Sequence, residues 1–171
     1  MIDLKNIEKH RARLLSDEKN NYSIVHVATK LYGVGGHTRV LYQFIKRHED
    51  NRQLVILTDQ AIENVPQWFV EDTKNISILS LNSISSLFER AYILRFLSGI
   101  AKCVVLHHHP DDVVPVIAFS HNTTSPVLLL NHAHSWFWLG ASITDMVLIH
   151  TEFHKNFTLA KRPLKNMSYF P

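Results

Sequence analysis

The sequence contains a single cysteine, Cys103, which excludes an internal disulfide and agrees with a reducing compartment. No apolar stretch approaches the roughly 18 uninterrupted residues that a membrane-spanning helix needs, and residues 1–15 are too charged for a signal peptide. The net charge is only +3, and the lysines and arginines are spread along the chain, which argues against nucleic-acid binding. We therefore expect a cytoplasmic protein that binds no nucleic acid.

Histidine is unusually frequent in this sequence. The chain has 12 histidines, and half of them fall between His107 and His134. A length of 171 residues suits one domain with a sizeable core, which we place at residues 22–171. Residues 1–21 carry a few apolar side chains among charges in a weakly amphipathic pattern, and this predicts a peripheral helix on the outside of the domain.

Short apolar segments alternate with segments of helical periodicity along the rest of the chain. The predicted strands are 23–29, 54–58, 76–81, 103–107, 126–131 and 145–150, and the predicted helices are 36–48, 61–72, 83–97, 112–121 and 152–160, before an extended stretch at 167–171. Apolar runs such as LVILT and CVVLH are typical of parallel strands covered on both faces. The alternation predicts an α/β fold with a doubly wound, mostly parallel, Rossmann-like sheet.

Ligand sites in such sheets lie outside the carboxyl ends of the strands, where the strand order reverses. The polar residues of this sequence gather directly after predicted strands. They occupy residues 30–39, 59, 107–112, 131–135 and 150–154. We therefore expect these segments to meet at one edge of the sheet.

Glycines mark the junction between the first strand and its helix, in the stretch GVGGHTRV at 33–40. The first two match the dinucleotide fingerprint G-x-G-x-x-G, but a threonine takes the third place and the acidic residue after the second strand, Asp59, lies farther along than usual. Gly35 and Gly36 at a helix start, with Arg39 one turn in, form an arrangement that favours a phosphate group. A turn that binds no ligand is the other interpretation.

Three successive histidines end the fourth predicted strand, at 107–109. They cannot all point into one site, because alternate side chains of an extended segment face opposite ways. One interpretation is a metal site that joins one of them to Asp111 or Asp112 and to a histidine of the 132–134 segment. The other is that the aspartates cap the next helix while the histidines are partly buried hydrogen-bonding groups.

The segment NHAHSWFWLG at 131–140 follows the fifth predicted strand. His132, just past a buried strand, is placed to act as a general base or to donate a hydrogen bond to a developing charge. The aromatic residues Trp136, Phe137 and Trp138 could line a sugar or base pocket, but such residues more often pack in a core.

Taken together, these motifs resemble the N-terminal domain of GT-B glycosyltransferases. The resemblance covers residues 22–171 and rests on the GGHTRV loop at 35–40, the His-x-x-Asp pattern at 109–112, the Asn-His-Ala-His run at 131–134 and the Thr-Glu-Phe start of the last helix at 151–153. The loop is similar to the GG-x-E-R-V segment of the large retaining group that includes bacterial lipopolysaccharide and mannosyl transferases. It departs from that pattern where His37 and Thr38 replace an apolar-acidic pair.

The resemblance implies a set of site residues. His132 would be catalytic, in contact with the transferred sugar or the donor. Residues that bind the donor diphosphate would be Gly35, Gly36, His37 and Arg39, and residues that bind the acceptor or sugar would be His109, Asp112, His134 and Trp136.

The resemblance also implies partners. They are a nucleotide-sugar donor, a glycan or lipid-linked acceptor of the cell-envelope polysaccharide type, and a second, donor-binding domain that would begin after Pro171, without which we expect no turnover. It implies no cofactor, and a location in the cytoplasm with peripheral association at the inner face of the membrane.

Two other functions stay open on the residues alone. A lone Rossmann-like domain could bind a nucleotide or phosphorylated ligand through residues 33–39 without catalysis. A metal-dependent hydrolase could be built on residues 107–112 and 132–134.

Overall fold

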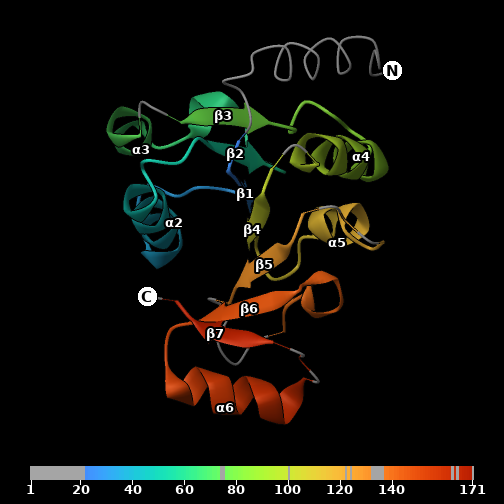
Figure 1. Cartoon of the computed structure of the whole chain (residues 1–171). Helices are drawn as coiled ribbons and strands as arrows, with labels where there is room; N and C mark the ends of the chain where they lie inside the picture. The colour runs from blue at the N-terminus through green and yellow to red at the C-terminus, as the bar shows by residue number, and fades with distance from the viewer. Residues whose placement is uncertain are drawn as a thin grey trace.

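The computed structural model describes residues 22–73, 76–99, 101–121, 123, 125–131, 137–162, 164 and 166–170. The helix predicted for residues 1–21 lies outside this description. Within it, the chain alternates between strands and helices, as the apolar periodicity predicted (Figure 1).

The strands are β1 (Ile24–Ala28), β2 (Gln53–Leu57), β3 (Ser77–Ser80), β4 (Cys103–His107), β5 (Val127–Leu130), β6 (Met146–Ile149) and β7 (Met167–Tyr169). The helices are α2 (Gly36–Arg47), η2 (Ile62–Asn64), α3 (Gln67–Asp72), α4 (Leu87–Ser98), α5 (Val114–Ala118), η3 (Ala141–Ile143) and α6 (Glu152–Lys161). The strands form one sheet in the order β3-β2-β1-β4-β5-β6-β7, and every adjacent pair is parallel. The predicted doubly wound, Rossmann-like α/β fold is confirmed.

Helices cover both faces of the sheet. Figure 1 shows α2 and α3 on one side of the central strands, with α4 and α5 on the other. One apolar cluster joins α2 and α3 to alternate residues of β1 and β2, such as Ala28 and Val55, and a larger one joins the intervening residues to α4 and α5. Every residue of β1 and β2 is buried, because both faces are covered.

Several predicted boundaries were wrong for local reasons. The helix predicted at 61–72 is interrupted by Pro66, which precedes α3 and leaves only a 3-10 turn before it. Helix α4 begins at Leu87 rather than at residue 83, because the Ser86 side chain accepts a hydrogen bond from the Glu89 N–H and caps it. Leu87, the first residue of this helix, is 46% exposed. The extended stretch after residue 166 contains the seventh strand, paired with β6.

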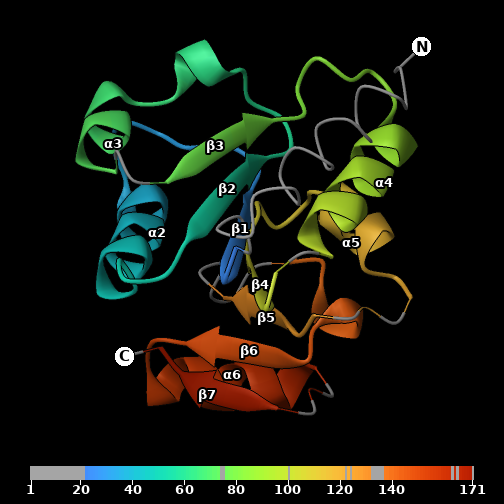
Figure 2. The same ribbon diagram turned by 45° about the horizontal axis from the view of Figure 1, so that its top comes forward.

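The strand order reverses at β1 and β4, which lie side by side in the middle of the sheet (Figure 2). After β1 the chain continues toward β2, and after β4 it continues toward β5. The two connections therefore leave the same edge in opposite directions, which is where ligands bind in sheets of this kind. We call this edge, with the residues directly after β1, β2 and β4, the rim.

Candidate functional site

The glycine turn, residues 33–36, joins β1 to α2 at the rim. Gly35 has a φ of 116°, which side-chain-bearing residues rarely adopt, and it immediately precedes the first residue of the helix. A Cβ at Gly33, Gly35 or Gly36 would meet nothing within 4 Å, so the space above the turn is open. Helix α2 has neither a side-chain cap nor an acidic residue in its first turn, and its N-terminal N–H groups suit an anion.

Buried contacts hold the turn in place. Thr38 is 1% exposed, and its hydroxyl oxygen accepts a hydrogen bond from the Tyr32 N–H at 2.7 Å. The preceding residue, Leu31, is bound through its N–H and its carbonyl by the side-chain amide of Gln60, at 2.7 and 2.9 Å. Thr38, which stands where the GG-x-E-R-V pattern has an acidic residue, therefore stabilises the turn itself.

The three successive histidines at the end of β4 face alternate ways, as predicted. His107 is buried beneath α2, and its backbone carbonyl accepts a hydrogen bond from Nε2 of His37. His109 is on the same side, with its ring centroid 5.4 Å from that of His37 and 5.5 Å from that of Tyr32, to which it is nearly parallel. His108 points the other way and donates from Nε2 to the Leu139 carbonyl at 3.1 Å.

His109 is half-buried, and this burial lowers its pKa below the ordinary value, against the nearby charges of Asp111 and Asp112, which raise it. His109 is therefore neutral near pH 7. The structure thus brings together two predicted site residues, His37 and His109, beside the open glycine turn.

Asp112, predicted to bind a sugar or acceptor, is engaged by the protein itself. Its Oδ2 accepts hydrogen bonds from the hydroxyls of Thr29, at 2.6 Å, and Thr58, and its Oδ1 accepts one from the Val114 N–H at 2.9 Å. Thr29 in turn accepts from the His109 N–H at 2.8 Å. The carboxylate joins the ends of β1, β2 and β4 and starts α5, so these contacts give it a structural role, in agreement with the capping interpretation.

Asp59, directly beyond β2, forms two ion pairs at the rim. Its carboxylate lies 2.8 Å from Arg90 of α4 and 3.1 Å from Lys30. The hydrogen bond from Arg90 is the main reason that the pKa of Asp59 is lowered, and the bond to Asp59 raises the pKa of Lys30. The acidic residue of the dinucleotide fingerprint is thus paired with two cations.

A chain of buried polar groups runs beneath α2. Gln53 donates both amide hydrogens, to the carbonyls of Ile45 at 3.0 Å and His48 at 2.8 Å, so its Oε1 must accept from Nε2 of His26 at 2.8 Å. With its proton on Nε2, neutral His26 accepts at Nδ1 from Nε2 of His107, 3.2 Å away.

Burial lowers the pKa of His26 from 6.5 to about 4, although the Gln53 hydrogen bond opposes this. His26 is therefore neutral at physiological pH, and the direction of each hydrogen bond among these buried polar groups is fixed.

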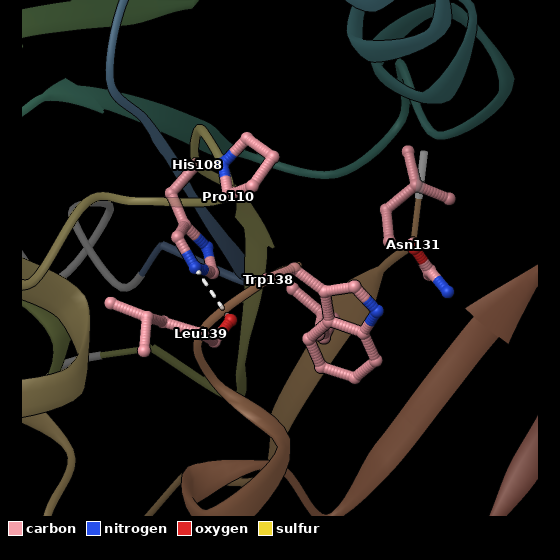
Figure 3. Close-up of a pocket in the computed structure, with 7 residues that line it drawn as sticks. His108, Pro110, Asn131, Trp138 and Leu139 are labelled. Carbon is pink, nitrogen blue, oxygen red and sulfur yellow. Dashed lines mark hydrogen bonds between the residues drawn. The ribbon is translucent and has the colours of Figure 1, made fainter. Parts of the chain in front are cut away.

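A small pocket lies near the ends of β4 and β5 (Figure 3). His108, Trp138 and Asn131 line it with Pro110 and three leucines, and the indole of Trp138 lies under the guanidinium of Arg162 at 4.4 Å. Burial lowers the pKa of His108. The packing interpretation is right for Trp138, which is 5% exposed, and wrong for Phe137, which is 69% exposed.

The predicted residues His132, His134 and Trp136 lie outside the described residues. The residues predicted to bind the donor, Gly35, Gly36, His37 and Arg39, all lie at the start of α2, and the Arg39 side chain is exposed there.

Sequence reasoning missed Tyr32, His26 and Gln53. The signal for His26 was present, because a lone polar residue stands in the apolar strand IVHVA, and such a residue needs buried partners.

Two absences hold for the described part of the chain. It contains no group of three or more His, Cys, Asp or Glu side chains that could hold a metal ion. In the same residues, no helix is both long and apolar enough to cross a membrane.

Comparisons with protein-family models, with curated proteins and with solved structures found no match to this chain.

Proposed function

We propose that the chain is the acceptor-side domain of a glycosyltransferase that transfers a sugar from a nucleotide-sugar donor to a glycan or lipid-linked acceptor. The observation that carries the proposal is the contact between the start of α2, just after the glycine turn, and the end of β4 at the reversal of strand order, through His37 and His107. A second, donor-binding domain would complete the site, and the enzyme would work in the cytoplasm at the inner face of a membrane.

The open start of α2 suits the diphosphate of the donor. The N–H groups of the first turn and the positive end of the helix dipole favour negative charge there, and the exposed Arg39 adds a cation one turn in. Gly35 and Gly36 place no side chain between these N–H groups and a ligand. This arrangement would stabilise charge on the leaving diphosphate.

His37 and His109 stand beside this anion position. His109 is neutral near pH 7, so it can accept or donate a hydrogen bond to a sugar hydroxyl. His132 carries the catalytic assignment only through the resemblance to the family.

The test is sugar transfer by the full-length protein. Purified enzyme is incubated with radiolabelled UDP-glucose, UDP-galactose or GDP-mannose and with a glycan and lipid extract, and labelled product is measured. Gly36→Ala should lower transfer at least tenfold without loss of stability, because its Cβ meets open space in the protein but would obstruct a close diphosphate. Gly33→Ala, equally open, is the matched control and should retain activity.

Failure of every donor to label a product would contradict the transferase. Equal activity of the two variants would contradict the diphosphate position. In the same assay His132→Ala should abolish most transfer, and full activity in that variant would remove its catalytic role.

A non-catalytic nucleotide-binding domain is the second candidate, and the Gly33-x-Gly35 spacing with a positive φ at Gly35 favours it. Titration of the protein with NAD(P) and with nucleotide sugars separates the two candidates. Tight NAD(P) binding that is lost in Gly35→Val would favour this second function. The ion pairs of Asp59 argue against it, since its carboxylate would have to leave two cations to accept a ribose hydroxyl.

A further inference from the structure

We propose that Tyr32 is a stacking platform for a sugar ring, and that the ligand at this part of the rim is an uncharged saccharide. The inference deepens the proposed function and rests on it only for the identification of that saccharide as the acceptor. The binding surface itself is argued from Tyr32 and its neighbours.

Tyr32 is exposed and yet firmly held. Its side chain is 50% exposed, while its N–H is bound to buried Thr38 and the preceding Leu31, 1% exposed, is fixed by Gln60 through two hydrogen bonds. One face of the ring lies against His109, with centroids 5.5 Å apart and planes 7° from parallel. A fixed, exposed aromatic ring loses little conformational entropy when a ligand covers it.

The support beneath the ring is equally fixed. The backbone N–H of His109 is bound to Thr29, and its ring contacts His37, which donates to the His107 carbonyl. Tyr32 therefore belongs to a preorganised cluster of three rings drawn from the connections after β1 and β4 and from α2.

The charged side chains near Tyr32 balance one another. Lys30 lies within electrostatic range of Asp111, and His109 lies within range of Asp111, Lys30 and Asp59. Lys30 and Arg90 are both paired with Asp59, and the exposed carboxylate of Asp111 balances the remaining positive charge. This group therefore has no net charge that would attract a phosphate or carboxylate, unlike the start of α2.

A neutral saccharide satisfies both features. The C–H face of a pyranose ring stacks on an aromatic face, while its hydroxyls donate to carboxylates and accept from an ammonium group or a neutral histidine. A lipid chain or an apolar peptide would leave the carboxylates of Asp59 and Asp111 and the Lys30 ammonium poorly solvated. Polar groups around one fixed ring thus point to a sugar.

The test is an NMR titration of the full chain with neutral methyl glycosides of glucose, galactose and mannose, and with UMP as an anionic probe. At least one glycoside should shift the Tyr32 ring resonances in a saturable way. Tyr32→Ala should weaken that binding at least tenfold, and Tyr32→Phe should retain it within about threefold, because stacking needs the ring rather than the hydroxyl. Tyr92→Ala is the matched control, since this α4 tyrosine is 56% exposed and should have no effect.

The proposal is overturned if no glycoside moves the Tyr32 resonances, if Tyr32→Ala binds like the wild type, or if UMP alone perturbs the ring. The transfer assay keeps the two proposals distinguishable. Glycoside binding at Tyr32 without any transfer would refute the transferase and leave the platform standing. Transfer that is unchanged in Tyr32→Ala would refute the identification of this saccharide as the acceptor and leave the transferase standing.

Discussion

Acid should destabilise the protein through His26, and the size of the effect follows from the structure. Folding lowers the pKa of this buried imidazole from 6.5 to about 4. Between these pH values the unfolded chain is protonated at His26 and the folded chain is not. The contribution to stability is complete above about pH 6.5 and is lost progressively as the pH falls toward 4. The gap corresponds to about 3 kcal/mol, since a tenfold change in proton affinity is worth about 1.4 kcal/mol.

The hydrogen-bond directions explain why folded His26 does not bind a second proton. A proton on Nδ1 of His26 would face the donor Nε2 of His107, and Gln53 cannot turn its amide because both its hydrogens are bound to α2 carbonyls. The adjacent His48 adds positive charge that opposes protonation, and the edge of Phe44 offers no acceptor.

The assay is urea denaturation at pH values from 7.5 to 4.5 for the wild type and His26→Gln. The variant should be less stable by about 1–3 kcal/mol at pH 7.5, because its amide replaces the imidazole contacts imperfectly. This difference in unfolding free energy should shrink toward pH 4.5, because only the wild type loses the stabilisation that comes from neutral His26. The titration of carboxylates affects both proteins equally and cancels in the difference. His121→Gln, at an exposed position, serves as the control and should track the wild type. A difference that stays constant over the whole range would refute the reasoning.

Two further substitutions test contacts at Asp112 and Gly140. Asp112→Ala should lower the unfolding free energy by about 2–4 kcal/mol in thermal denaturation, because three donors lose their acceptor. Asp111→Ala, at the neighbouring exposed position, should change the unfolding free energy by less than about 0.5 kcal/mol, and equal effects of the two variants would contradict the structural role of Asp112. Gly140→Ala should cost about 1–3 kcal/mol, since φ is 114° and a Cβ would lie 3.2 Å from the His108 ring, while Gly99→Ala meets only ordinary contacts and should be close to neutral in chemical denaturation. A neutral Gly140→Ala would show that the loop relaxes freely.

Much of the fold was accessible from the sequence because its signals are local. Apolar runs such as CVVLH fix the position of β4, since a strand covered on both faces needs continuous apolar character. The location of the glycine turn at the rim follows from the same alternation of strands and helices. Proline and serine set the starts of α3 and α4: Pro66 interrupts the helix predicted at 61–72, and a boundary placed at Ser86 would have corrected the predicted start of α4.

The contacts that organise the site are not local, and this is why the sequence did not reveal them. Asp112 meets Thr29 across 83 positions and Thr58 across 54, and His26 meets His107 across 81. The apolar periodicity of the sequence does not predict which two polar side chains will form a buried hydrogen bond once the strands pair. The resemblance predicts that Asp112 binds the acceptor or sugar, and the residues alone also allowed it to cap the next helix; neither signal indicated its partners Thr29 and Thr58.

The position of Gln53 has a consequence for α2 as a whole. Helices commonly fray in their last turn, where carbonyls have only water as a donor, but here a buried amide occupies the carbonyls of Ile45 and His48. At the opposite end His37 is bonded to the strand beneath. A helix secured at both extremities has little freedom left to lose, so whatever docks at its beginning meets a surface that is already in its final shape.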